Sequence, residues 1–462
     1  MNKIRKKLHF NAFVMNTVSH IHHGQWRRPD AKQSEFNDVN LWIELAKLLE
    51  AAKFDAIFFA DVTGLYGDAD SEFDIYAKEG LQIPSNDPIV LLSALAAHTK
   101  DIGLALTSNI LQSHPFHFAR QLSTLDHISN GRVGWNIVTG VQDNGSRNFG
   151  LGQLTDHTER YEWAEEYVNV TYKLWEGSWD EGAVLKDRIN GIYSDPSNIH
   201  KIHHRGNRYS VEGPHLSSPS PQRTPVLFQA GSSESGRKFA AKNAEAVFIA
   251  APSPEVAATQ IAETRRLARD LGRNPEDLKF FQGLSFIIGD TSEEAVAKSK
   301  EYDRYVSVDG YLAHTAIVDK NGRVYDRNTP IKDIETNTVR GALELVSKYI
   351  TDREPTIADL VYLRTHNPHT CIVGTAEQIA DKIEEWQEAG IDGINVVNWV
   401  IPGSFEEFAD EILPVLRTRG LAQSEYVSGS FREKIFGSAF LNERHPAARY
   451  RGAFRGHDKL RG

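Results

Sequence analysis

Eight times along this chain, a short apolar run is followed by a stretch with helical spacing. Most of the runs are continuous and rich in β-branched and aromatic residues, which is typical of strands buried on both faces of a parallel sheet. The predicted strands cover residues 8–14, 54–60, 102–107, 133–138, 225–229, 246–250, 278–288 and 394–397. Such strands need a covering layer on each face, so the stretches between them decide the architecture.

Those stretches carry apolar residues three and four positions apart, the spacing of amphipathic helices. The predicted helices cover residues 40–53, 87–99, 115–129, 158–175, 236–243, 254–271, 292–305, 375–389 and 405–416. Eight strands alternating with helices predict an α/β fold, a (β/α)₈ TIM barrel. A doubly wound open sheet is the second interpretation. Its dinucleotide-binding version is weakened because no G-x-G-x-x-G motif follows the first strand.

We interpret residues 1–462 as a single barrel domain with two insertions. The first covers about residues 177–224, after the fourth strand, and is irregular and rich in His, Gly, Pro and Ser. The second covers about residues 306–368, after the seventh strand. Both are too long to be ordinary connections. The polar, Arg-rich tail, residues 420–462, is expected to wrap the body of the protein or a partner subunit.

Composition excludes several functional classes. The chain has 52 basic and 62 acidic residues, a net charge of −10, which argues against nucleic acid as its main partner. Its one cysteine, Cys371, leaves no disulfide framework and no cysteine metal cluster. The sequence shows no signal peptide and no apolar run near the roughly 20 residues of a membrane helix. We therefore expect a cytoplasmic protein that does not enter a membrane.

The strongest local signal for a ligand is the turn Ala230-Gly231-Ser232-Ser233, between the fifth predicted strand and the next helix. Backbone N–H groups, a helix N-terminus and two hydroxyls would together attract an anion, most naturally a phosphate. The plainer interpretation is that a serine caps the helix. Late βα loops of barrels often bind phosphate, which favours the anion site.

Two polar residues interrupt or end buried strands. Asn136 lies inside the fourth predicted strand, and Asp61 follows the second directly. Each has two interpretations. A buried amide is either satisfied by the backbone or presented to a ligand, and the carboxylate is either a helix cap or an active-site group. His157 and Tyr161 lie one turn apart at the start of a helix, so both side chains can face one site.

The chain has eighteen histidines, several of them close together in sequence. His20, His22 and His23 form one group, and His203 and His204 another, but their spacing matches no zinc template. We therefore predict no metal site. Neither a P-loop nor a nucleophile motif is present. A phosphate pocket without an obvious protein nucleophile suits an enzyme whose reactive group is a bound cofactor.

Several long motifs resemble the bacterial luciferase-like flavin monooxygenases. They read L-D-H-I-S-N-G-R-V-G-W-N-I-V-T, H-T-E-R-Y and P-S-P-Q-R-T-P-V-L-F-Q-A-G-S-S. The match is to the branch that contains nitrilotriacetate monooxygenase component A and the dibenzothiophene-sulfone and dimethylsulfide monooxygenases. The resemblance runs from F-N-A-F-V near the start to P-G-S-F-E-E-F and L-R-T-R-G near the end.

The resemblance implies a TIM barrel, reduced FMN as cosubstrate with O₂, and a separate NAD(P)H-dependent flavin reductase as partner. It also implies a homodimer or homotetramer. The residues that it assigns to FMN are Asp61, Thr107, Asn136, His157, Tyr161, Ser232 and Ser233. The chain reads T-S-N near Thr107 where relatives often carry T-x-S. Which side chain meets the flavin there is therefore an open question.

The implied chemistry is insertion of one oxygen atom beside a heteroatom, at a site that excludes water. We predict His20 and His314 as the catalytic candidates, because an imidazole can transfer protons near neutral pH. Surface histidines are the plainer interpretation of both. The run Q-I-P-S-N-D-P favours a small organosulfur substrate and cleavage of a C–S bond.

Three alternatives remain open at this point. The same machinery could cleave a C–N bond of an aminopolycarboxylate, which would need several cations such as Arg27 and Arg28 in the pocket. A non-catalytic flavin-binding protein would bind oxidised FMN and oxygenate nothing. A deazaflavin enzyme would favour F420 over FMN.

Overall fold

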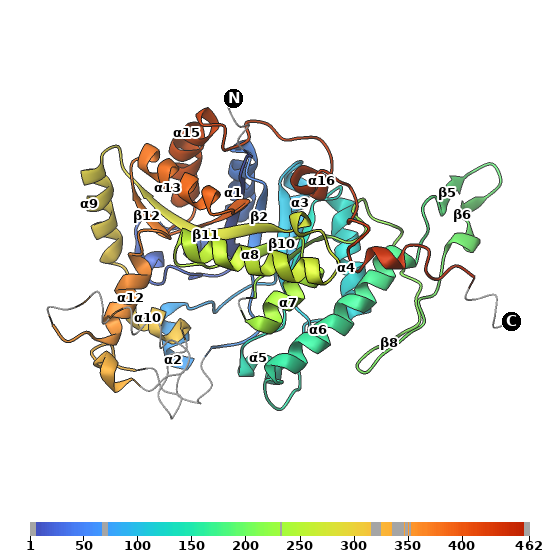
Figure 1. Cartoon of the computed structure of the whole chain (residues 1–462), viewed down its shortest axis with the longest axis horizontal. Helices are drawn as coiled ribbons and strands as arrows, with labels where there is room; N and C mark the ends of the chain where they lie inside the picture. Colours follow the sequence, from blue (N-terminus) through green and yellow to red (C-terminus); the bar gives the residue numbers. More distant parts are fainter. Residues whose placement is uncertain are drawn as a thin grey trace.

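Eight parallel strands close into a barrel at the centre of the molecule, in a computed structural model that describes residues 6–66, 73–231, 233–315, 325–334, 346, 350 and 353–456 (Figure 1). The strands are β1 (His9–Met15), β2 (Ala56–Ala60), β3 (Gly103–Asn109), β4 (Val133–Val138), β9 (Val226–Gln229), β10 (Ala246–Ile249), β11 (Lys279–Ile288) and β13 (Gly393–Val397). Each pairs with the next in this order, and β13 pairs with β1 to close the ring. The predicted (β/α)₈ barrel is confirmed, and the open sheet is wrong.

Helices surround the barrel and cover the outer face of its strands (Figure 1). They are α1 (Val39–Ala51), α3 (Pro88–His98), α4 (Pro115–Ile128), α6 (His157–Tyr172), α7 (Glu234–Asn243), α8 (Pro254–Asp270), α9 (Ser292–Asp303) and α13 (Ala376–Glu388). A last helical segment consists of α14 (Gly403–Glu407), the π-helical turn η7 (Phe408–Ile412) and α15 (Leu413–Thr418). Side-chain hydrogen bonds at the N-cap fix where several of these helices begin. The Asp87 side chain, for example, accepts a hydrogen bond from the backbone N–H of Ile89 at the start of α3.

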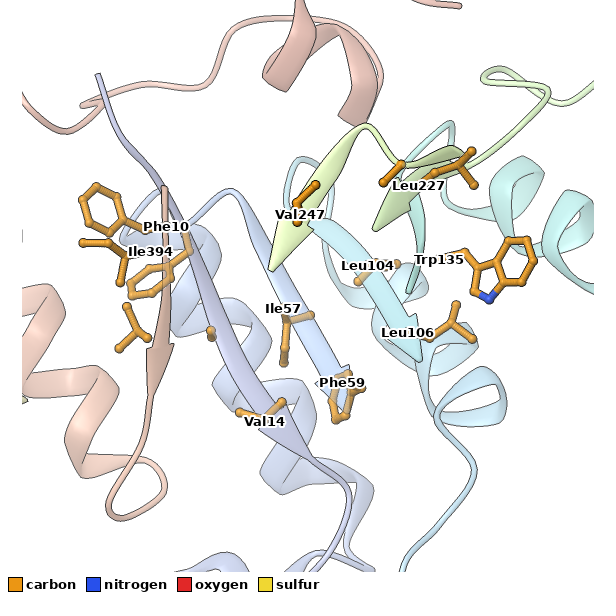
Figure 2. Close-up of a cluster of buried hydrophobic side chains, with 14 of the residues drawn as sticks. Phe10, Val14, Ile57, Phe59, Leu104, Leu106, Trp135, Leu227, Val247 and Ile394 are labelled. Carbon is orange, nitrogen blue, oxygen red and sulfur yellow. The ribbon is translucent and has the colours of Figure 1, made fainter. Parts of the chain in front are cut away.

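Strand side chains alternate between two cores. Those that point outward pack against the helices, and Figure 2 shows Leu104, Leu106 and Trp135 among them. Those that point inward fill the barrel and include Phe58 and Phe228, which form a smaller buried cluster of their own. Successive residues of a strand face opposite sides of the sheet, so residues two positions apart share a core. We call this odd or even placement along the strand the parity of a position.

The C-terminal tail packs against the body and closes one end of the barrel. The helix α16 (Phe431–Phe436) places the Phe431 ring beside Gly103 and Gly134, where a Cβ atom at Gly103 would lie 2.5 Å from that ring. The next residue, Arg432, donates two buried hydrogen bonds of 2.8 and 2.9 Å to the carboxylate of Glu245. The tail is therefore an integral part of the barrel core.

The two insertions contain more regular structure than their sequences predict. The first holds two small antiparallel pairs, β5 (Val184–Asp187) with β6 (Ile192–Ser194) and β7 (His204–Arg205) with β8 (Ser210–Val211). The β5–β6 hairpin stands away from the barrel (Figure 1). The second holds η6 (Ile331–Asp333) and the helices α10 (Val308–His314) and α12 (Ile357–Thr365).

A ninth strand, β12 (Cys371–Gly374), was not predicted from the sequence. It pairs with the last four residues of β11, Ser285–Ile288, which extend beyond the part of β11 that pairs inside the barrel. Four residues between an insertion and a helix leave too short a pattern to identify a strand. Three short helices outside the second insertion, α2 (Phe73–Glu79), α5 (Asp143–Asn148) and α16, were missed for the same reason.

Candidate active site

The carboxyl ends of β2, β3, β4 and β9 surround a cavity of about 220 Å³. Asp61 lines it directly after β2, and Tyr161 reaches it from the first turns of α6. This is the end of a barrel at which enzymes of this architecture carry their chemistry. Two sequence-predicted residues therefore meet at one cavity, although one hundred positions separate them in the chain.

Thr107 and Asn136 lie side by side on the inner face of the barrel. The strand register pairs them directly, and both have the parity of the inward-facing Ala105. The Asn136 side-chain amide donates a 3.0 Å hydrogen bond to the Thr107 hydroxyl. Its carbonyl oxygen Oδ1 is buried and has no hydrogen-bond partner among the residues that the structure describes. Leaving such an atom unpaired costs about 1–3 kcal/mol, so a ligand N–H group there would be stabilising.

Asp61 is held by an amide from the next strand loop. Gln112 donates a 3.0 Å hydrogen bond to its carboxylate. Burial raises the pKa of Asp61 from its ordinary value to about 7, with a small further contribution from the charge of Asp87. The carboxyl group can therefore exchange a proton near neutral pH, where an ordinary aspartate stays ionised.

The start of α7 is the place where the sequence predicts an anion site. Ser233 caps this helix, and its hydroxyl accepts a 3.1 Å hydrogen bond from the backbone N–H of Gly236. The Tyr161 hydroxyl bonds to Ser233, and burial raises the pKa of Tyr161, so the phenol keeps its proton. A Cβ atom on Gly236 would lie 2.8 Å from the Tyr161 oxygen and 2.9 Å from the Cα atom of Gly231. Because Gly231 and Gly236 have no Cβ atom, the backbone of the turn can lie this close to the start of α7 and to Tyr161.

Two predicted cofactor residues remain, His157 and Ser232, and the structure describes the first of them. His157 is the exposed first residue of α6, and its ring meets the Tyr161 ring edge-on with 5.2 Å between centroids. Asp156 caps α6 by accepting hydrogen bonds from two backbone N–H groups. Ser232 lies outside the residues that the structure describes. The H-x-x-x-Y spacing thus brings the two rings into contact one helical turn apart.

His20 follows β1 and His314 ends α10, and the amide nitrogen of Gln82 contacts both residues. His20 packs its ring 4.6 Å from the Phe13 ring, and its buried Nδ1 atom has no hydrogen-bond partner within the described part of the chain. Burial lowers the pKa of both histidines to about 3. The sequence predicted imidazoles that titrate near neutral pH, and this prediction is wrong. Desolvation keeps both rings uncharged.

One glutamine determines which nitrogen of His314 carries the proton. The Gln82 carbonyl oxygen accepts a 3.0 Å hydrogen bond from the Tyr66 hydroxyl. Its amide nitrogen donates to the His20 backbone carbonyl at 2.9 Å and contacts His314 Nε2 at 3.2 Å. Since an amide nitrogen can only donate, His314 Nε2 accepts, and the proton of this neutral ring lies on Nδ1.

The chain of hydrogen bonds continues from His314 to two further residues. His314 Nδ1 lies 2.6 Å from His23 Nε2, and His23 Nδ1 lies 2.8 Å from the Ser19 hydroxyl. With the proton of His314 on Nδ1, His23 Nε2 accepts a hydrogen bond from it. The proton of His23 then lies on Nδ1, which donates a hydrogen bond to the Ser19 hydroxyl. Sequence reasoning did not find Tyr66, Gln82 or His23 as site residues. The Q-I-P-S-N-D-P run that begins at Gln82 was the available signal.

A second cavity, of about 430 Å³, lies at the other half of the barrel mouth, around the ends of β10, β11 and β13. The helices α10 and α12 of the second insertion cover it. Arg27 and Arg28, proposed as cations for an aminopolycarboxylate, do not line it. Arg28 instead forms ion pairs with Asp30 and Glu301. Within the described residues, no group of three or more His, Cys, Asp or Glu is placed to hold a metal ion.

The model of one protein family, described as luciferase-like monooxygenase, matches residues 13–393. The long-chain alkane monooxygenase of Geobacillus thermodenitrificans is 43% identical, over 96% of this chain and 98% of that protein. The dimethyl-sulfide monooxygenase of Hyphomicrobium sulfonivorans is 39% identical, over 99% of this chain and 96% of that protein.

Solved structures agree with these matches. The crystal structure of DmoA from Hyphomicrobium sulfonivorans superposes with a TM-score of 0.90 at 40% identity, covering 98% of this chain and 97% of that one. In the part of the chain that the structure describes, none of the helices has the length and apolar character needed to cross a membrane. The barrel, the site at its mouth and these matches together show that the chain belongs to the luciferase-like monooxygenase family.

Proposed function

We propose that this enzyme uses reduced FMN and O₂ to oxygenate a small organosulfur compound, and that a C–S bond then breaks. The observation that carries the proposal is the pairing of two cavities at one barrel mouth. One has a polar lining that includes Asp61 and Tyr161. Asn136, whose amide oxygen has no partner among the described residues, precedes the lining residue Ile137, and Ser233 of the proposed anion site bonds to Tyr161. The other is larger and mostly apolar. A flavin and a small organic substrate would fill these two spaces side by side.

The residues around the smaller cavity fit FMN. The buried Asn136 carbonyl would accept from a ring N–H group, and Thr107 holds that amide in place. The Asp61 carboxyl group would meet the polar edge of the ring. The hydroxyls of Ser233 and Tyr161, with the N-terminus of α7, would bind the phosphate. Of the other two predicted contacts, His157 packs its ring against Tyr161, and Ser232 lies outside the described residues.

Bound reduced FMN would supply the electrons that activate O₂. In the reaction that we propose, one oxygen atom is added to the carbon beside sulfur and the other leaves as water. The hydroxylated carbon then releases a thiol and becomes an aldehyde, so no further oxidant is needed. The protein must keep water out during this step, because water would divert the oxygen to hydrogen peroxide.

His20 and His314 would contribute as neutral groups. An uncharged imidazole that keeps one N–H group and one acceptor can orient a substrate or an oxygen atom by hydrogen bonding. His314 is held in one tautomer by Gln82, while the buried Nδ1 atom of His20 keeps a free hydrogen-bonding position. We propose both as orienting residues, with Asp61 as the group near the flavin that exchanges a proton close to pH 7.

Two of the relatives support a substrate with an apolar body. The names of two relatives specify a long-chain alkane and dimethyl sulfide, both of them uncharged. A flavin cofactor is further supported by a riboflavin lyase, solved with modified FMN and riboflavin, whose structure has a TM-score of 0.87 and 34% identity to this chain, covering 96% of it and 100% of the other. An NAD(P)H-dependent flavin reductase would supply the reduced FMN. We also propose a homodimer or homotetramer.

Rapid mixing tests the proposal. The protein is loaded with reduced FMN without oxygen, mixed with oxygenated buffer, and followed by its flavin absorbance. A transient spectrum that differs from both reduced and oxidised FMN, and that decays faster with an organosulfur substrate, supports oxygenation. Product analysis should then find a thiol and an aldehyde. Direct reoxidation that no organosulfur or aminopolycarboxylate compound alters would contradict the proposal and favour a flavin-binding or F420-dependent protein.

A further inference from the structure

The larger cavity is mostly apolar, and most of its polar groups already have partners. Its apolar lining includes Ile21, Ala250, Leu312, Leu360, Val361, Leu363 and Val397. At its inner end, the Gln282 amide donates to the backbone carbonyls of Ala251 and Gly283, and its oxygen accepts from the N–H group of Ala251. Satisfied polar groups have little to gain from a ligand, so most of this wall selects an apolar surface.

The polar side chains on the opposite wall are also satisfied. The Ser285 hydroxyl donates toward the Thr370 carbonyl and the Cys371 sulfur. The Asn367 amide donates a 2.9 Å hydrogen bond to the Pro252 carbonyl. Burial raises the pKa of the Cys371 thiol to about 11, so it carries no charge near neutral pH. None of these groups would recognise a charged ligand.

Two aromatic side chains contact each other in the same wall, and the buried Nε2 atom of His22 has no hydrogen-bond partner among the described residues. The Tyr311 hydroxyl lies 2.9 Å from His22 Nδ1, and the His22 ring stacks on Trp399 with 3.6 Å between centroids. Burial lowers the pKa of His22 to about 3, so this ring is also neutral. The cavity therefore has neither a histidine cation nor, among the described residues that line it, an acidic side chain.

Arg364 is the exception. It lies on α12 at the exposed rim of the cavity, and its guanidinium forms no hydrogen bond or ion pair with another residue that the structure describes. It is the single Lys or Arg among the described lining residues. Its charge contributes to lowering the pKa of His22, which lines the cavity, and of His314, which lies outside it. A free guanidinium is well suited to bind a carboxylate or a similar oxyanion with two hydrogen bonds.

We propose that the substrate is an amphiphile with an apolar thioether body and one terminal oxyanion, and that Arg364 binds the anion at the rim. This proposal rests on the proposed function and specifies its substrate class. The apolar body then extends inward, toward Gln282 and the barrel axis, where the oxygen is delivered. A dianion would place its second charge against apolar or uncharged groups, which is costly. A neutral thioether would leave the guanidinium without its partner.

A matched substrate series tests the assignment. The three probes are 3-(butylthio)propanoate, butyl propyl sulfide and S-butyl-mercaptosuccinate, which carry one, zero and two carboxylates on similar bodies. The assay measures kcat/KM for thiol and aldehyde release, and the fraction of O₂ lost as hydrogen peroxide. We expect the monoanion to exceed both others by about tenfold, because charge-assisted hydrogen bonds are the strong ones but the rim is open to solvent. Equal values for the monoanion and the neutral sulfide would overturn the proposal.

Substitution of the arginine separates recognition from folding. Arg364→Gln should reduce kcat/KM for the monoanion by about tenfold and leave the neutral sulfide within about threefold, and Arg364→Lys should restore part of the loss. The control is Arg266→Gln, which removes another exposed arginine, from α8 and outside the cavity, and should change kcat/KM for neither substrate. An equal loss on both substrates with Arg364→Gln would refute the role of Arg364.

The outcomes also distinguish this proposal from the function on which it rests. If thiol and aldehyde form from all three probes without preference for the monoanion, the enzyme is an organosulfur monooxygenase and the assignment of Arg364 is wrong. If none of the probes alters flavin reoxidation, the proposed function itself fails. In that case a binding titration of the FMN-loaded protein with 3-(butylthio)propanoate still tests the anion site, because tenfold weaker binding in Arg364→Gln needs no turnover.

Discussion

Substitution of Gly236 by alanine is expected to weaken FMN binding without unfolding the barrel. The added Cβ atom would lie 2.8 Å from the Tyr161 hydroxyl oxygen and 2.9 Å from the Cα atom of Gly231. Non-bonded carbon contacts settle near 3.5–4.0 Å, so the phenol must move by about 0.7 Å or more. The backbone at Gly231 has less freedom to move. The hydroxyls that would bind the phosphate are therefore displaced.

The magnitude follows from what the displacement removes. Loss of one hydrogen bond to a charged phosphate costs about 1.5–3 kcal/mol, which raises Kd about 10- to 150-fold. Overpacking costs the fold about 1–3 kcal/mol, and the change from glycine to alanine inside a helix returns about 1 kcal/mol. We therefore expect the free energy of unfolding to fall by at most about 2 kcal/mol.

Anaerobic titration with reduced FMN gives the Kd, and thermal unfolding monitors the fold. The matched control is Gly152→Ala, because a Cβ atom at Gly152 meets no atom within 4 Å. It should leave both quantities unchanged. A wild-type Kd in Gly236→Ala, together with an intact fold, would show that the turn before α7 does not bind the phosphate.

Three further changes test other parts of the structure. Asn136→Ala removes the unpartnered buried carbonyl and should raise the Kd for reduced FMN about tenfold, whereas an unchanged Kd would place the flavin ring elsewhere. Phe431→Ala opens a cavity at the closed end of the barrel and should lower the free energy of unfolding by about 3–5 kcal/mol. Phe440→Ala, at a ring that is 41% exposed, should cost less than about 1 kcal/mol, and equal losses would argue against the packing role of Phe431. Asp61→Asn should flatten the dependence of stability on pH, which denaturant unfolding between pH 4 and pH 8 can measure.

The sign of the last effect follows from the raised pKa of Asp61. A carboxyl group whose pKa is about 7 in the folded protein and near its ordinary value when unfolded binds its proton more tightly in the folded state. Its contribution to stability is complete below the unfolded pKa and is lost as the pH rises through 7. The wild type should therefore lose stability relative to Asp61→Asn over this range. Parallel pH profiles for the two proteins would contradict the raised pKa.

The positions of Thr107 and Asn136 illustrate how far local patterns reach. Both could be assigned to strands from sequence, and the family motifs indicated that they meet a flavin. That they bond to each other follows from the register of β3 and β4, which depends on how two strands pair across the barrel. The hydrogen-bond chain through Gln82, His314 and His23 is even harder to predict from local sequence patterns. It joins segments nearly 300 positions apart, so no window of the sequence contains it.

The burial of each titratable group could not be predicted from the sequence either. His20 and His314 are ordinary loop histidines by sequence, and only their burial makes them neutral. Asp61 is an ordinary loop carboxylate by sequence, and only desolvation moves its pKa into the range where it can exchange a proton. Desolvation depends on everything that packs around a group, and most of those neighbours are distant in the chain.

By itself, the sequence determined the order of strands and helices, the barrel class and the family, because hydrophobic periodicity and long motifs are local properties. It also determined which strand ends carry polar side chains. Only the tertiary structure decided that the tail closes the barrel with Phe431, that β12 extends β11, and that Arg364 is left as the one unpaired cation among the described residues lining the larger cavity. These features depend on contacts between distant segments, whose geometry is set when the barrel closes.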